Sequence, residues 1–290
     1  MELTAALKKE FMKFQRNEIT EYHIYSLLAA NTSCPNNRKI LYRIAEDERR
    51  HYYQWKEVTG QEVLPHRFRL WKYYLIARVF GLTFGIKLME AAEKDITTVY
   101  GSYEKHYAPA GQLAAEEDEH ERTLINMIDE EHLKYTGSIV LGLNDALVEL
   151  TGALAGFTLA LQNTKLIALT GTITGIAAAF SMAASEYLST KSEETDKNPV
   201  KSAVYTGAAY IVTVLLLISP YLFLKNYFVC LAITLSLGVI IIASFNYYIS
   251  VAKDLNFKRR FLEMTCLSLG IAAISFLIGW LLRTFTGIEI

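Results

Sequence analysis

The sequence predicts an all-α protein in two parts, a soluble four-helix bundle followed by a membrane domain of five helices. Hydrophobic residues make up 52% of the 290 residues, but charges are divided unevenly along the chain. Residues 1–136 hold 19 Lys/Arg and 21 Asp/Glu, whereas residues 137–290 hold 10 and 9. All six His lie in the first part. We therefore expect a soluble domain over 1–136 and a membrane domain over 137–290.

Charge and cysteine usage exclude several classes of protein. The net charge of -1 argues against a nucleic-acid partner, because proteins that bind nucleic acid carry a basic surface. The three Cys are scattered without paired spacing, which predicts neither a disulfide framework nor a structural zinc site. The N-terminal stretch is charged and amphipathic, and it lacks the apolar core of a signal peptide.

Four helices are predicted in the first part, because apolar residues recur there at helical spacing. They cover residues 3–30, 36–58, 67–104 and 112–134. Pro35, Gly60, Pro109 and Gly137 mark the breaks, as prolines favour helix starts and glycines favour helix ends. Short joins and the absence of a strand pattern favour a four-helix bundle.

Acids and histidines recur on these helices at the spacing of metal ligands. A Glu-x-x-His motif begins at Glu48 and another at Glu117, and each places a carboxylate and an imidazole on one helix face. The preceding helix offers a lone Glu, 30 residues before the first motif and 27 before the second. Di-iron carboxylate bundles are built in this order, and these donors suit iron or manganese. The candidate ligands are Glu18, Glu48, His51, Glu90, Glu117 and His120.

The segments around these ligands resemble the rubrerythrin-like branch of the ferritin superfamily. Four segments carry the resemblance: Asn17–Tyr25, Ala45–His51, Leu88–Glu93 and Glu116–His120. It implies a ferritin-like bundle with a di-iron centre, in which the six candidates are ligands and Glu93 is an additional carboxylate. No rubredoxin-like tail of four Cys is present, which argues against an electron relay of the rubrerythrin type. Glu21 is either a surface residue or a support for the ligands.

Residues 68–84 are apolar and aromatic, with Lys72 and Arg78 among them. Three interpretations are open for this stretch. It lies on a membrane surface, it packs against a second copy of the bundle, or it forms an ordinary buried face.

The second part holds five apolar stretches long enough to cross a bilayer as helices. They cover residues 138–161, 166–189, 201–222, 227–250 and 262–284. Seven Lys/Arg fall in the joins on the side of the N-terminal domain, against three on the other side. Positive residues favour the inner side, which predicts a multi-pass protein of the cell membrane with its N-terminal domain in the cytoplasm.

The first two spans carry acids. Asp145 and Glu149 are four residues apart, as are Met182 and Glu186, so each pair shares a helix face. An ionised carboxylate in a bilayer costs at least about 2 kcal/mol, and such groups usually face a cavity, a partner or an ion. The hairpin therefore predicts a cation pathway. The alternative is that the acids lie near the helix ends and reach water.

The segments Gly142–Glu149 and Ser181–Glu193 resemble the first two spans of the vacuolar iron transporter family. The resemblance implies a homodimer that exports Fe²⁺ or Mn²⁺ from the cytoplasm in exchange for protons. It places Asp145, Met182 and Glu186 on the pathway, and spacing adds Glu149. The join after the second span lacks the metal-collecting insert of vacuolar members, so the N-terminal bundle is expected to replace it.

Two functions from different classes follow. In the first, the chain is a metal transporter whose bundle collects, senses or oxidises the ion. In the second, it is a membrane-anchored di-iron oxidase or peroxidase in oxidative-stress defence, and the spans are an anchor. Acids inside the spans favour the transporter, because an anchor needs none.

Overall fold

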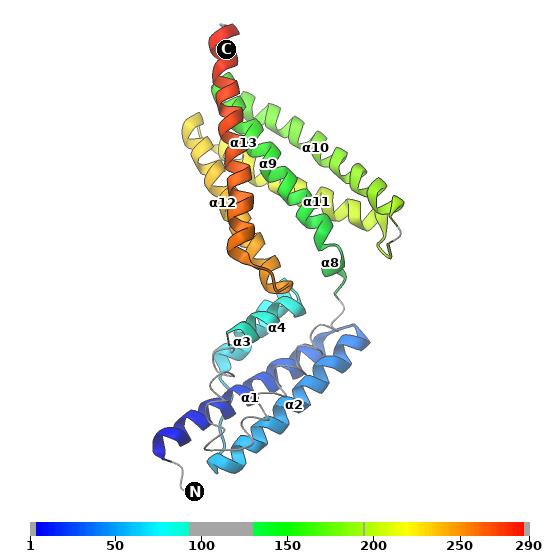
Figure 1. The fold of residues 1–290 in the computed structure, drawn as a ribbon, viewed down its shortest axis with the longest axis vertical. Helices are drawn as coiled ribbons and strands as arrows, with labels where there is room; N and C mark the ends of the chain where they lie inside the picture. The colour runs from blue at the N-terminus through cyan, green and yellow to red at the C-terminus, as the bar shows by residue number, and fades with distance from the viewer. Residues whose placement is uncertain (1–3, 93–129, 194, 287–290) are drawn as a thin grey trace. The chain divides into compact units, whose positions relative to one another are not determined.

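The computed structural model describes residues 4–92, 130–193 and 195–286, and every regular element in these ranges is an α-helix (Figure 1). This confirms the all-α class. The chain divides into two compact units, residues 1–130 and 131–290. The continuation of the predicted third helix beyond Ala92, and most of the predicted fourth helix, lie outside the described residues.

Two long helices form the frame of the first unit. α1 spans Ala5–Asn31 and α2 spans Pro35–Thr59, and the short link between them turns the chain back on itself. Pro35 stands at the start of α2, where its missing N–H is not needed. Gly60 ends α2 at a φ of 64° and donates its N–H to the Lys56 carbonyl, as in a left-handed helix end. Side chains from both helices fill the core: Ile24, Tyr25, Leu28, Leu41 and Ile44.

The predicted third helix is broken at Gly81, which corrects the expectation of one long helix. α3 spans Arg67–Phe80 and α4 spans Leu82–Ala91. Gly81 has φ 103° and ψ 152°, a conformation that essentially only glycine adopts without strain. Gly85 allows α4 to approach α3, since a Cβ at this position would lie 2.5 Å from the Ala77 Cα.

The start of α4 is stabilised by a side chain from later in the chain. The first N–H groups of a helix have no partner within the helix. Here the Glu130 carboxylate accepts from the N–H of Leu82 at 2.7 Å and from that of Thr83 at 2.8 Å. The break was not predictable, because a lone glycine within an apolar periodic stretch costs only about 1 kcal/mol in a continuous helix.

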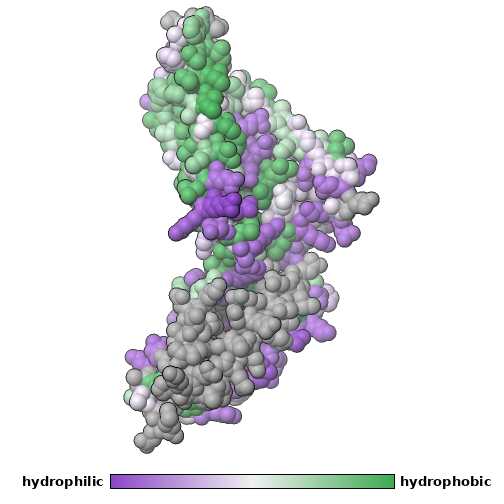
Figure 2. All heavy atoms as spheres, viewed as in Figure 1, coloured by the Kyte–Doolittle hydropathy of each residue, from purple (hydrophilic) through white to green (hydrophobic). Residues whose placement is uncertain are grey.

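Five long apolar helices make up most of the second unit, as expected, and each is long enough to cross a membrane. Hydrophobic residues cover much of the visible face of the last of them (Figure 2). The protein is therefore a multi-pass membrane protein. After the short α8 (Glu131–Lys134), the five are α9 (Thr136–Leu161), α10 (Thr164–Ser192), α11 (Pro199–Phe223), α12 (Tyr227–Ala252) and α13 (Phe257–Thr286).

Asparagine side chains fix the starts of the last four of these helices. Each side-chain oxygen accepts from backbone N–H groups two or three residues further on, at distances of 2.9–3.3 Å. Such caps each contribute about 1 kcal/mol and let short joins separate long helices. The four residues are Asn163, Asn198, Asn226 and Asn256.

α9 is the helix on which the second unit is assembled, since it packs against each of the other four long helices. Gly142 lies against the backbone of Thr206 on α11, and Gly156 lies against Gly279 on α13. A Cβ at Gly142 or at Gly279 would collide with the facing backbone, so these small residues set the close approach. The helix with the most neighbours is thus also the one that carries Asp145.

Candidate metal sites

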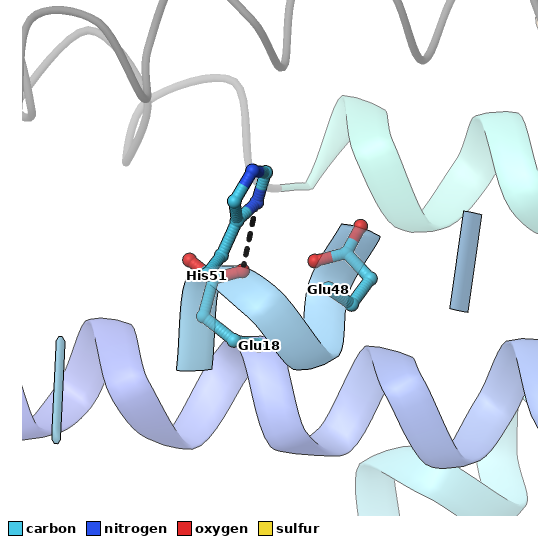
Figure 3. Close-up of side chains that lie close together, drawn as sticks. All are labelled: Glu18, Glu48 and His51. Atoms are coloured by element: carbon cyan, nitrogen blue, oxygen red, sulfur yellow. Dashed lines mark ion pairs between the residues drawn. The ribbon is translucent and has the colours of Figure 1, made fainter. Parts of the chain in front are cut away.

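Three of the predicted ligands converge in the core of the first unit (Figure 3). Glu18 comes from α1, and Glu48 and His51 come from adjacent turns of α2. One donor atom of each lies within 4.8 Å of the others, and all three residues are buried. His51 Nδ1 is 3.7 Å from Glu18 Oε2. The Glu-x-x-His spacing produces this arrangement, because it places both side chains on the face of α2 that packs against α1.

The chemistry of this group fits a metal ion. Burying two carboxylates is unfavourable unless they are compensated. Trp55 Nε1 donates to Glu18 Oε1 at 3.2 Å, which compensates one oxygen. Carboxylate oxygens and an imidazole nitrogen are ligands that divalent iron and manganese accept. The buried group can therefore bind a metal ion.

The remaining predicted ligands are placed only in part. Glu90 lies on α4 and is half-buried. Within the described ranges it is not a member of the group formed by Glu18, Glu48 and His51. Glu93, Glu117 and His120 lie outside the described residues. The complete di-iron ligand set therefore stays a prediction.

Glu21 is a buried carboxyl that sequence reasoning did not place. It is only 7% exposed, which excludes the surface alternative. Burial raises the pKa of Glu21 to about 8, and the nearby Glu18 adds to the rise, while Arg69 and His51 oppose it. In the part of the chain that the structure describes, its Oε1 has no hydrogen-bond partner. Its burial could have been inferred from its position three residues after Glu18, on the same helix face.

In the second unit, the two acids of α9 lie at different depths in the protein. Asp145 is half-buried, whereas Glu149 is exposed. The hydroxyl of Tyr210, a fully buried residue of α11, donates to Glu149 Oε2 at 2.7 Å. Sequence reasoning missed Tyr210, because a uniformly apolar span does not show which of its faces meets a neighbour.

Glu186 links the first two spans. It is half-buried on α10 and accepts a hydrogen bond from Ser138 Oγ of α9 at 2.6 Å. The two helices are joined by a short turn and run antiparallel, so this bond fixes their register. At 1.5 Å per residue, Met182 lies about 6 Å and Asp145 about 10 Å along the helices from this bond, in the same direction.

This register places the predicted pathway residues at successive levels along the two helices. Met182 is half-buried and packs on the core between α9, α10 and α11. Glu149 lies one further turn beyond Asp145, about 16 Å from the Ser138 level. The structure thus brings the four predicted pathway residues onto two packed helices at successive levels.

A comparison with protein-family models matches this part of the chain. Comparison with curated proteins gave no match. The model described as the VIT family matches residues 136–197 and 192–280, which together cover α9 to most of α13 and include both acid-bearing spans. No family is assigned to the N-terminal helices. The match covers half of the chain, and the chain therefore belongs to the VIT family.

Proposed function

We propose that this protein exports Fe²⁺ or Mn²⁺ from the cytoplasm across the cell membrane, with protons as the counter-ion. The observation that carries the proposal is the series Glu186, Met182, Asp145 and Glu149 along two packed helices of a VIT family domain. Carboxylate oxygens and a thioether sulfur are acceptable ligands for Fe²⁺. A carboxylate releases its proton before it binds metal, so metal and protons compete for the same groups. Competition of this kind couples their opposite movements.

The distribution of cations supports an orientation in which the first unit lies on the cytoplasmic side. With the first unit on the cytoplasmic side, the joins after α10 and α12 face inward. These joins hold seven Lys/Arg, against three on the opposite side, as the positive-inside rule requires. The inward joins hold Lys191, Lys197, Lys201, Lys253, Lys258, Arg259 and Arg260.

The exposure of Glu149 supports a homodimer. Gly137 and Leu141 are also exposed, and with the half-buried Asp145 they form a four-residue repeat along α9. A carboxylate that faces lipid costs several kcal/mol. Two copies that meet along this stripe remove the carboxylates from lipid and enclose them between two first spans. An ion then passes between donors contributed by both copies.

The N-terminal helices are proposed to collect, sense or oxidise the ion as a ferritin-like bundle. Glu18, Glu48 and His51 support this role, because they are a buried and preformed set of donors. With Glu90, Glu93, Glu117 and His120 they would complete a di-iron centre, which supplies redox chemistry when bound. In this role the bundle replaces the collecting insert that is absent from the join after α10.

The same buried group favours a second candidate function, a membrane-anchored di-iron oxidase or peroxidase. A simple binding site does not need donors this deep in the core, whereas redox chemistry benefits from exclusion of water. The two functions differ in which residues they require. Oxidation requires the buried group of the first unit, and transport requires the acids of the second.

The transport proposal is tested in sealed vesicles that contain the full-length protein. Asp145→Asn and Glu186→Gln keep the side-chain shape and remove the charge. We expect each to lower Fe²⁺ flux by about tenfold or more, because each removes a charged metal ligand and a tenfold effect corresponds to a loss of only about 1.4 kcal/mol. Glu263→Gln is the control, because this acid of α13 is exposed and near the membrane end. Wild-type flux in both test variants, with the protein folded, contradicts the proposal.

Tyr210→Phe tests the contact that orients Glu149. The substitution keeps the buried ring and removes the donor to the carboxylate. We expect the KM for Fe²⁺ to rise about three- to tenfold with a smaller change in maximal flux, because one hydrogen bond contributes about 1 kcal/mol. Tyr221→Phe is the matched control, because it also removes a buried tyrosine hydroxyl, but one that bonds to Thr158 rather than to a carboxylate. Equal KM values for the two variants would show that Glu149 needs no orientation.

The pKa of Glu21 predicts a pH effect on metal binding to the first unit. Below about pH 8 the carboxyl is neutral, and above it the added negative charge attracts a cation more strongly. We expect Glu21→Gln to match the wild type in Mn²⁺ affinity at pH 6 and to bind more weakly at pH 8.5. Binding is measured by titration calorimetry on full-length protein that carries Asp145→Asn. Affinities that differ at pH 6 but agree at pH 8.5 contradict the assigned direction.

Peroxide turnover separates the second candidate function from the first. Reduced full-length protein with Fe²⁺ is mixed with hydrogen peroxide, and peroxide consumption per protein is counted. An enzyme consumes many equivalents, loses this activity in Glu48→Gln and keeps it in Asp145→Asn. Consumption that stops at the amount of bound iron leaves the first unit as a binding site and rejects the enzyme.

A further inference from the structure

α3 is apolar on two opposite faces. One face is buried against α1 through Leu70, Tyr73 and Ala77. The other face is exposed over about three turns, and its large side chains follow helical spacing. They are Phe68 at 75%, Trp71 at 55%, Leu75 at 55% and Val79 at 72% exposed. Leu64, just before the helix, is 82% exposed. Scattered apolar residues are ordinary, but a continuous exposed stripe of this kind indicates an interaction surface.

The charged residues of the segment that carries this stripe have one sign. Residues 63–89 contain no Asp or Glu. Arg67, Lys72 and Arg78 are exposed beside the stripe. Trp71 packs edge-on against Tyr74 at 5.7 Å between ring centroids, and Trp and Tyr are enriched where protein meets the headgroup layer of a bilayer.

We propose that the exposed face of α3 docks on the lipid surface of the membrane that the same chain spans. Apolar side chains enter the boundary between headgroups and acyl chains, and the flanking cations contact anionic headgroups, as in interfacial amphipathic helices. The five long helices keep the first unit close to a bilayer, so the effective concentration of lipid is high. The proposal rests on the membrane domain and is independent of metal transport.

A second copy of the first unit fits this face less well. A two-fold contact places the same patch of both copies together. Lys72 and Arg78 would then face cations of the partner, with no acid of the stripe to balance them, and like charges at an interface are unfavourable. An anionic lipid surface complements both the apolar stripe and its charges.

The test measures whether lipid reaches Trp71 in the full-length protein. The protein is reconstituted in vesicles of phosphatidylcholine and phosphatidylglycerol whose acyl chains carry bromine, which quenches tryptophan on contact. Trp280→Phe removes the exposed indole of α13, leaving Trp71 and the fully buried Trp55. We expect bromine to quench this variant strongly, and to quench it about twofold less in vesicles of phosphatidylcholine alone.

Two controls make the result decisive. Adding Trp71→Phe to the Trp280→Phe variant leaves the buried Trp55 as the sole tryptophan. We expect bromine no longer to quench the fluorescence of this double variant. A variant with Phe68→Glu and Leu75→Glu is expected to lose the quenching of Trp71. The matched control carries Tyr42→Glu and Tyr53→Glu at similarly exposed positions of α2, and it is expected to keep the quenching. Absence of bromine quenching of Trp71 in anionic vesicles overturns the proposal, and so does quenching that survives the Phe68 and Leu75 substitutions. Protection of Trp71 from both bromine and aqueous iodide identifies a protein partner instead.

Discussion

A carboxylate removed from water has to be compensated by a proton, a hydrogen-bond donor or a cation, and both units are arranged around this requirement. Hydrogen-bond donors are supplied in the pairs Glu18–Trp55, Glu149–Tyr210 and Glu186–Ser138. Glu21 is compensated by a proton, because its raised pKa keeps it neutral at pH 7. A single neutral hydrogen-bond donor does not balance a full negative charge, so the carboxylates of Glu18, Glu149 and Glu186 can each also receive a cation.

The sequence predicted the parts of the structure that depend on local pattern. Apolar length located the five membrane helices to within a few residues, because turns capped by asparagine leave little freedom at their ends. The Glu-x-x-His spacing correctly grouped Glu48 with His51, because residues three apart on a helix share a face. Glu18 was predicted to join them because it lies on the preceding helix, and two helices joined by a short link pack together.

The sequence did not predict what depends on contacts between distant segments. Tyr210 and Ser138 are common residue types in apolar spans, and only the packing of α9 against its neighbours brings them to Glu149 and Glu186. The break at Gly81 depends on the cap that Glu130 supplies from 48 residues further on. Glu21 was left open because its burial is decided by the segment around Arg69, which packs on α1 only in the folded chain.

Charge balance connects the two units chemically. If Glu18 and Glu48 release their protons to bind metal, they bring two negative charges to the buried group, which one divalent cation would balance. Burial raises the pKa of Glu21 to about 8, so this neighbouring carboxyl adds no third charge near pH 7. Release of the ion then requires the carboxylates to take up protons, because uncompensated charge in a low-dielectric core is unfavourable. The exchange proposed for the membrane acids is the same one, a divalent cation against protons. A chain that used the proposed exchange at both sites would bind and release the ion at each without an uncompensated buried carboxylate.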